Sequence, residues 1–229
     1  MIGKFIAIEG IDGVGKATQT KLLSDAISAS GKECLTLEFP NYKKSVFGKL
    51  LGECLAGERI DFVNMDARLA SLPYMIDRYE SAQMIREALA RGVYVISDRF
   101  SASNQIHQGG KMQDDASRIE LLDWLDFAEH GILGNPQPDV VVYLSAPVEV
   151  SLKLLEQKRA AKSSNVKDGA KDTVENDLNY LRNSHAMAQW LAQRYKGLWR
   201  MIDCTDGTGS MRSREDIHQD VLGIVNALG

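Results

Sequence analysis

The sequence predicts an α/β fold, a parallel sheet of about five strands flanked by helices on both faces. Five short apolar runs have the length and composition of buried strands: residues 5–9, 34–39, 93–97, 140–144 and 200–203. Between them, apolar side chains recur three and four positions apart, as at Ile76, Tyr79, Ile85 and Leu89, which is the helical period. Strands that alternate with helices in this way form parallel sheets covered on both sides.

The first apolar run leads into a glycine-rich turn and then into a helical segment. The turn and the helix start comprise Gly10, Ile11, Asp12, Gly13, Val14, Gly15, Lys16, Ala17 and Thr18. Glycines let successive N–H groups point into one concavity, and the helix N-terminus adds partial positive charge. A lysine at position 16 can reach β- and γ-phosphates. An ordinary strand-to-helix turn is the alternative, but the joint register of glycines and lysine favours a phosphate-binding P-loop.

One position departs from the P-loop pattern. The residue after the lysine is expected to be Ser or Thr, whose hydroxyl contacts Mg²⁺, but here it is Ala17, and a hydroxyl follows at Thr18. Asp12 lies among amides that face phosphate, which favours a role in holding Mg²⁺ or orienting a lysine. The alternative is a turn-forming aspartate before Gly13.

Bulk composition restricts the class of protein. A chain of 229 residues is expected to form a single domain over residues 1–229, and 44% hydrophobic residues allow a sizeable core. A net charge of −4 argues against nucleic acid as the main partner. The three cysteines form no Cys-x-x-Cys pair, so we expect neither a disulfide framework nor a zinc site. No membrane-spanning run or cleavable signal is visible, so we expect no membrane partner and a cytoplasmic location.

Polar residues follow the second and third predicted strands. Asp98 and Arg99 come directly after the run at 93–97, and Phe39 and Pro40 end the run at 34–39. Ligands bind at the carboxyl ends of parallel strands, so these residues should open onto the same crevice as the P-loop. An arginine there can grip a phosphate with two parallel hydrogen bonds. An ordinary surface ion pair is the alternative for Asp98 and Arg99.

Two further segments are candidates for ligand contact. Tyr74 and Arg78 are four residues apart, so on a helix they share a face that can stack on a flat ring. Aromatics at this spacing also occur as ordinary core residues, and Pro73 predicts that the helix begins or kinks there. Residues 158–171 are small, polar and basic, which indicates a mobile lid or a solvated linker.

Taken together, these motifs resemble the thymidylate kinase family of P-loop nucleoside monophosphate kinases over almost the whole chain. The resemblance rests on these segments: IEGIDGVGK at 8–16, Phe39-Pro40, YMIDR at 74–78, DRFSASN at 98–104, QGG at 108–110 and PDVVVYL at 138–144. It implies a P-loop kinase fold with a mobile lid, usually as a homodimer. The implied reaction moves the γ-phosphoryl group of ATP onto dTMP, with Mg²⁺, to give dTDP and ADP.

The resemblance also implies roles for individual residues. Tyr74 matches the aromatic that stacks on the base, and Arg78 matches the arginine that contacts it. Asp98 and Arg99 match the pair beside the monophosphate and the metal, and Asp12 matches the P-loop acid. The thymine pocket would be shaped by Phe39, Pro40, Ser103 and Asn104.

Two residues differ from the family's usual arrangement. His107 stands where a tyrosine is frequent near the sugar. The P-loop has no arginine, so a catalytic arginine must come from the lid, where Arg159 is the only one. The expected catalytic residues are therefore Asp12, Lys16, Arg99 and Arg159, and without a hydroxyl at Ala17 the metal would be held through Asp12 and Asp98.

Two alternatives remain at this point. One is another nucleoside or nucleotide kinase on the same scaffold, in which Glu9 or Asp98 would serve as general base for a nucleoside. The other is a nucleotide-binding regulatory protein that has lost transfer, which only Ala17 favours. An Asn-Lys-x-Asp guanine-reading motif is absent, which argues against a GTPase.

Overall fold

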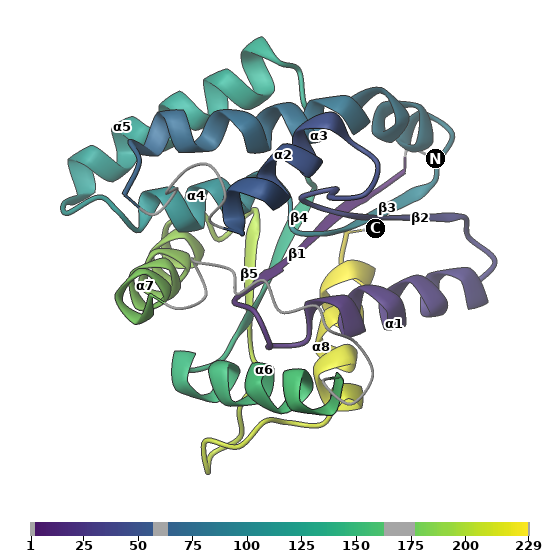
Figure 1. Ribbon diagram of the computed structural model, residues 1–229. Helices are drawn as coiled ribbons and strands as arrows, with labels where there is room; N and C mark the ends of the chain where they lie inside the picture. Colours follow the sequence, from purple (N-terminus) through teal and green to yellow (C-terminus); the bar gives the residue numbers. More distant parts are fainter. Residues whose placement is uncertain (1–2, 57–63, 163–176, 229) are drawn as a thin grey trace.

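A parallel five-stranded sheet forms the centre of the computed structural model, which describes residues 3–56, 64–162 and 177–228 (Figure 1). The strands are β1 (Phe5–Gly10), β2 (Cys34–Glu38), β3 (Tyr94–Asp98), β4 (Val140–Ser145) and β5 (Trp199–Asp203). They lie in the order β2-β3-β1-β4-β5, and every neighbouring pair is parallel. The predicted strands are confirmed, each with bounds within one residue of those observed.

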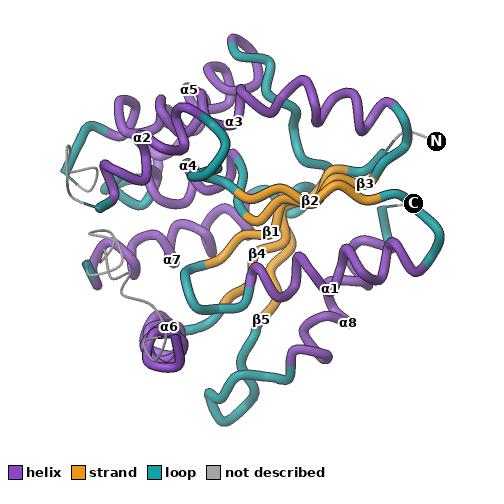
Figure 2. Tube along the Cα trace, turned by 45° about the vertical axis from the view of Figure 1, so that its right-hand side comes forward, coloured by secondary structure: helices purple, strands orange, loops and turns teal. Residues whose placement is uncertain are grey.

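Helices cover both faces of this sheet. On one face lie α1 (Lys16–Ala29) and α8 (Arg214–Asn226); on the other lie α3 (Ala67–Ala90), α4 (Ser101–Gly109), α5 (Asp115–Asp126) and α7 (Leu178–Arg194) (Figures 1 and 2). The remaining elements are α2 (Val46–Leu55), which packs on α3, the π-helix η1 (Phe127–Ile132) after α5, and α6 (Val148–Lys162).

The alternation of side chains along the strands explains the two cores. Phe5 and Ala7 of β1 pack into the core under α3, α4 and α7, whereas Ile6 and Ile8 pack into the core under α1 and α8. Every residue of β1 and β4 is buried. A strand buried on both sides reads as a continuous apolar run, which is why the sequence located these strands so closely.

The start of α3 differs from the prediction. The helix begins at Ala67 and runs through Pro73, so of the two alternatives expected at the proline, a start or a kink, the start is wrong. Asp66 fixes the start, because its side chain accepts hydrogen bonds from the backbone N–H groups of Arg68 and Leu69. The final helix begins at Arg214, where the Ser213 side chain caps it.

The three cysteines form no disulfide with one another. All three are free; Cys54 and Cys204 are buried, and Cys34 is half-buried. In the described ranges no helix is both long enough and apolar enough to cross a membrane.

A core substitution tests the packing of α1, the helix that follows the P-loop. Leu23 is fully buried in the core with α8, and we expect Leu23→Ala to lower the free energy of unfolding by about 2–5 kcal/mol, measured by urea titration. Leu22→Ala is the matched control, because Leu22 is only half-buried on the same helix and should cost much less. Equal losses in the two variants would contradict this packing.

Candidate active site

Two adjoining hollows lie at the carboxyl edge of the sheet. The first, here called the P-loop cleft, is lined by Asp12, Gly13, Gly15, Lys16, Ala17, Thr18, Glu38, Phe39, Pro40, Tyr42, Asp98 and Arg99. The second, here called the inner cavity, has a cavity volume of about 90 Å³. Its lining includes every residue matched to the acceptor pocket except Asp98: Phe39, Pro40, Tyr74, Arg78, Arg99, Ser103, Asn104 and His107. Asp12, Phe39, Pro40, Tyr42 and Arg99 line both hollows, so the two lie side by side.

The P-loop has the geometry that its glycines predict. Gly10 ends β1 with a φ of +150°, and a Cβ there would lie 2.8 Å from the carbonyl oxygen of Leu144. Gly15 caps α1 in the left-handed region with a φ of +111°. Lys16 is the first residue of α1, and its Nζ donates to the carbonyl oxygen of Ile11 at 3.2 Å. The turn therefore places the lysine and the helix N-terminus at the cleft, an arrangement suited to phosphate. Ile11 itself lines the inner cavity rather than the cleft, and Val14 is buried in the core.

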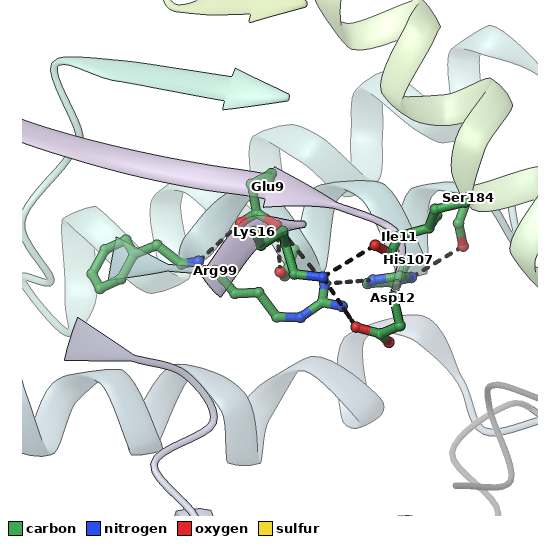
Figure 3. A network of polar contacts seen from close by, with 9 residues as sticks. Glu9, Ile11, Asp12, Lys16, Arg99, His107 and Ser184 are labelled. Atoms are coloured by element: carbon green, nitrogen blue, oxygen red, sulfur yellow. Dashed lines mark hydrogen bonds and ion pairs between the residues drawn. The ribbon is translucent and has the colours of Figure 1, made fainter. Parts of the chain in front are cut away.

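Asp12 is shared by two cations. Its Oδ1 accepts hydrogen bonds from Lys16 Nζ at 3.0 Å and from Arg99 Nη2 at 2.7 Å (Figure 3). Burial opposes ionisation of this carboxyl, but Arg99 and Lys16 outweigh burial and hold the pKa of Asp12 well below its usual range. The Asp12 carboxylate is thus ionised and holds the side chains of Lys16 and Arg99 close together.

Arg99 adopts a strained backbone held by its neighbours. Its φ is +66°, in the left-handed region that residues other than glycine rarely adopt. The Arg99 N–H donates to the Ile8 carbonyl at 2.9 Å, and the Glu9 carboxylate accepts from Phe100 N at 2.9 Å and from Ser103 Oγ at 2.8 Å. Burial raises the pKa of Glu9. Both Glu9 oxygens help to fix this turn, and Glu9 lines neither hollow, so it is not placed to act as a general base on a bound ligand.

His107 is a neutral side chain beside this arginine. Its Nε2 lies 3.5 Å from Arg99 Nη1, and its Nδ1 lies 3.1 Å from Ser184 Oγ (Figure 3). Its ring also stacks on Tyr180, with centroids 5.7 Å apart. Burial and Arg99 lower the pKa of His107 to about 3. A guanidinium can only donate hydrogen bonds, so the neutral ring accepts one from Arg99 at Nε2. The proton of the ring is then on Nδ1, which donates a hydrogen bond to Ser184 Oγ.

The far end of the inner cavity combines flat and polar groups. Tyr74 is half-buried, and Arg78 is buried and ion-paired with Glu129. Asn104 Nδ2 donates to the backbone oxygen of Ser71 at 3.2 Å. An aromatic ring beside donors of this kind suits a planar heterocycle that carries carbonyl oxygens.

The sequence analysis assigned no role to several lining residues: Leu55, Asp77, Tyr180 and Leu181 in the inner cavity, and Glu38 in the cleft. Phe100 and Gln108 lie within the DRFSASN and QGG segments, and Tyr42 lies in the cluster that follows the strand predicted at 34–39. Tyr180 and Leu181 come from the start of α7, far from every motif, so only the fold brings them here. Asp77 falls inside the YMIDR segment, which was the available signal.

The acidic groups of the cleft fit a divalent cation in part. Asp98 lines the cleft together with Glu38 and Asp12. Burial raises the pKa of Asp98 against the pull of Lys16 and Arg99, and the neighbouring Glu38 and Asp12 raise it further. A cation would relieve this crowding of carboxylates. However, Asp12 already binds two side-chain cations, and the described residues contain no preformed cluster of three or more His, Cys, Asp or Glu ligands.

The predicted lid lies mostly outside the described residues. Residues 158–162 form the end of α6, where their side chains are not described, and residues 163–171 fall in an undescribed range. The role of Arg159 therefore stays a prediction.

Comparison with known proteins assigns the family. A family model described as thymidylate kinase matches residues 8–215. The thymidylate kinase of Mycobacterium tuberculosis is 33% identical over 199 residues, covering 86% of this chain and 90% of that protein. A probable thymidylate kinase of Thermococcus gammatolerans is 30% identical over 230 residues, covering 98% of this chain and 96% of that protein.

A solved structure supports the same fold. The thymidylate kinase of Candida albicans has a TM-score of 0.71 to this chain at 20% identity, covering 99% of this chain and 92% of that one. The match in fold, together with the family model and the two relatives, leads to one conclusion. This chain belongs to the thymidylate kinase family.

Proposed function

We propose that this kinase transfers the γ-phosphoryl group of ATP to dTMP, giving dTDP and ADP. The observation that carries the proposal is the pair of adjoining hollows that share Asp12 and Arg99, one built for phosphate and one for a flat base. Two nucleotides bound in them would meet phosphate to phosphate at the cations. Phosphoryl transfer needs mainly this positioning and charge neutralisation.

The residues divide between donor and acceptor. Lys16 and the P-loop amides would hold the phosphates of ATP, with Ala17 and Thr18 at the edge of the cleft. Arg99 would contact the monophosphate of dTMP, and His107 would lie toward its sugar. The thymine would occupy the part of the inner cavity lined by Phe39, Pro40, Tyr74, Arg78, Ser103 and Asn104.

Magnesium would be held through Asp98, with Asp12 and waters completing its oxygen ligands. When bound, it would neutralise charge on the phosphates of ATP. Asp12 would retain a second task, which is to hold Lys16 and Arg99 in place.

We also propose that the chain works as a single cytoplasmic domain and as a homodimer, without a nucleic-acid or membrane partner. A dimer is supported by one face of α3, where Leu69, Leu72 and Tyr79 are 59%, 38% and 51% exposed. Exposed apolar side chains repeated along one helix face are typical of an interface.

The comparisons give no support to the two alternatives. A nucleoside kinase would need a general base; Glu9 is engaged in holding the turn at Arg99, which leaves Asp98 at the cleft as the remaining candidate for that reaction. A regulatory protein without transfer rests only on Ala17.

The choice of acceptor tests the proposed function. We expect dTMP to give the highest kcat/KM in an ADP-release assay with dTMP, dUMP, dCMP, AMP, GMP and thymidine, because the inner cavity offers an aromatic face and amide and guanidinium donors. Equal or faster turnover of dCMP or of thymidine would contradict the proposal.

A serine at position 17 tests how the metal is held. Ala17 is exposed at the cleft, so an added hydroxyl has room and would supply an oxygen ligand in place of a water. We expect Ala17→Ser to remain active and to need less Mg²⁺ for half-maximal rate, with Ala17→Val as a control that adds bulk without oxygen. Loss of activity in the serine variant would give the alanine a steric role instead.

An alanine at position 159 tests the lid arginine. The P-loop carries no arginine, and one placed on the transferring phosphoryl group stabilises the transition state. We expect Arg159→Ala to lower kcat by roughly 10² with little change in the KM for dTMP, since Lys158 and Lys162 can cover part of the loss. Lys153→Ala, exposed on the same helix, is the control. An unchanged kcat would remove Arg159 from the catalytic residues.

A further inference from the structure

The orientation of Arg78 is set by a carboxylate that no motif includes. The side chains of Arg78 and Glu129 are each only 2% exposed. Arg78 Nη2 donates to Glu129 Oε2 at 2.8 Å, and Arg78 Nε donates to the other oxygen, so the pair is bidentate. Such a pair fixes the plane of a guanidinium as well as its position.

Glu129 is itself held in place. Asn135 Nδ2 donates to Glu129 Oε1 at 3.2 Å and to the backbone oxygen of Met75 in α3 at 3.1 Å. The Asn135 N–H also donates to the backbone oxygen of Glu129 at 3.0 Å. Asn135 therefore links the Glu129 carboxylate to Met75 of α3, the helix that carries Arg78.

The π-helix η1 explains how a glutamate comes to lie inside. Glu129 is 1% exposed, whereas Phe127 and Ile132 at the two ends of η1 are 64% and 68% exposed. The Leu133 N–H reaches the Ala128 oxygen five residues earlier, which is the wide turn of a π-helix. Short π-helices recur at functional sites, where they redirect a side chain.

The pairing with Glu129 leaves one nitrogen of the Arg78 guanidinium, Nη1, available for a ligand. Its Nε and Nη2 face Glu129, while Nη1 has no hydrogen bond to any residue in the described ranges. Arg78 lines the inner cavity beside Tyr74 and Asn104. The free Nη1 carries two N–H donors and no acceptor, so it matches a carbonyl oxygen on a base edge and not an amino group.

We infer that Glu129 is a positioning residue that makes the site select the base of its acceptor, by holding Arg78 with its free donors toward a carbonyl-bearing pyrimidine. This inference rests on the proposed function, in which the inner cavity receives thymine. A long arginine side chain without this partner would sample several orientations. It would then contact the thymine carbonyl less often and would discriminate less against the amino group of cytosine.

A double-mutant cycle of Glu129→Gln and Arg78→Ala tests the inference, with kcat and KM measured for dTMP and dCMP. We expect Glu129→Gln to raise the KM for dTMP by roughly tenfold, with kcat changed less than about threefold, because the contact binds ground state and transition state alike. The preference for dTMP over dCMP should fall by a similar factor. In the Arg78→Ala background, Glu129→Gln should change neither quantity further.

Glu120→Gln is the matched control. Glu120 of α5 has a 74% exposed side chain and pairs with Arg68. Arg68 lies on α3, as Arg78 does, but it does not line the inner cavity. Removal of the Glu120 carboxylate should leave both KM values unchanged. If Glu129→Gln does not fold, Glu129→Asp keeps the charge with a shorter reach and should show the same shift in KM and preference, to a smaller extent.

An unchanged preference in the folded Glu129 variants would overturn the inference, as would an equal loss in the Arg78→Ala background. A wild-type enzyme inactive on dTMP would instead overturn the proposed function. Calorimetric binding of dTMP and dCMP to the wild type and to Glu129→Gln would then still decide the role of Glu129.

Discussion

A single carboxylate oxygen organises this site. Asp12 Oδ1 receives both Lys16 and Arg99, and these three residues come from the P-loop, the first turn of α1 and the end of β3. A kinase must bring two polyanionic nucleotides together, and its cations would repel one another without a shared anion. Asp12 lets the positive charge be concentrated between the two hollows before any phosphate arrives.

The sheet makes this meeting of charges possible. Parallel pairing sets Ile8 and Glu38 each beside Asp98, so β2 and β3 end level with one another while β1 continues beyond them to Gly10. Two cores hold that alignment, one on each face of the central strand β1. The loops that follow the strands therefore converge on one edge, and the chemistry of the site depends on a register that apolar side chains maintain.

The sequence predicted what local patterns encode. Buried parallel strands are continuous apolar runs, so their bounds were found within one residue. The motif segments named most residues that line the two hollows, although their roles remain predictions. Tyr180 and Glu129 could not be found this way, because Tyr180 reaches the cavity only through the packing of α7 and Glu129 reaches Arg78 only through a π-helical turn. The start of α3 was missed because an aspartate cap outweighs the local preference of a proline.

The left-handed backbone of Arg99 has a consequence for how this enzyme can change. A residue with a side chain held at a φ of +66° costs on the order of 1–3 kcal/mol, which glycine would largely avoid. Glycine at position 99 would therefore relax the turn, but only arginine keeps the guanidinium. The change to glycine would remove the ion pair with Asp12, so the backbone and the charge network of the site favour different residues at this position.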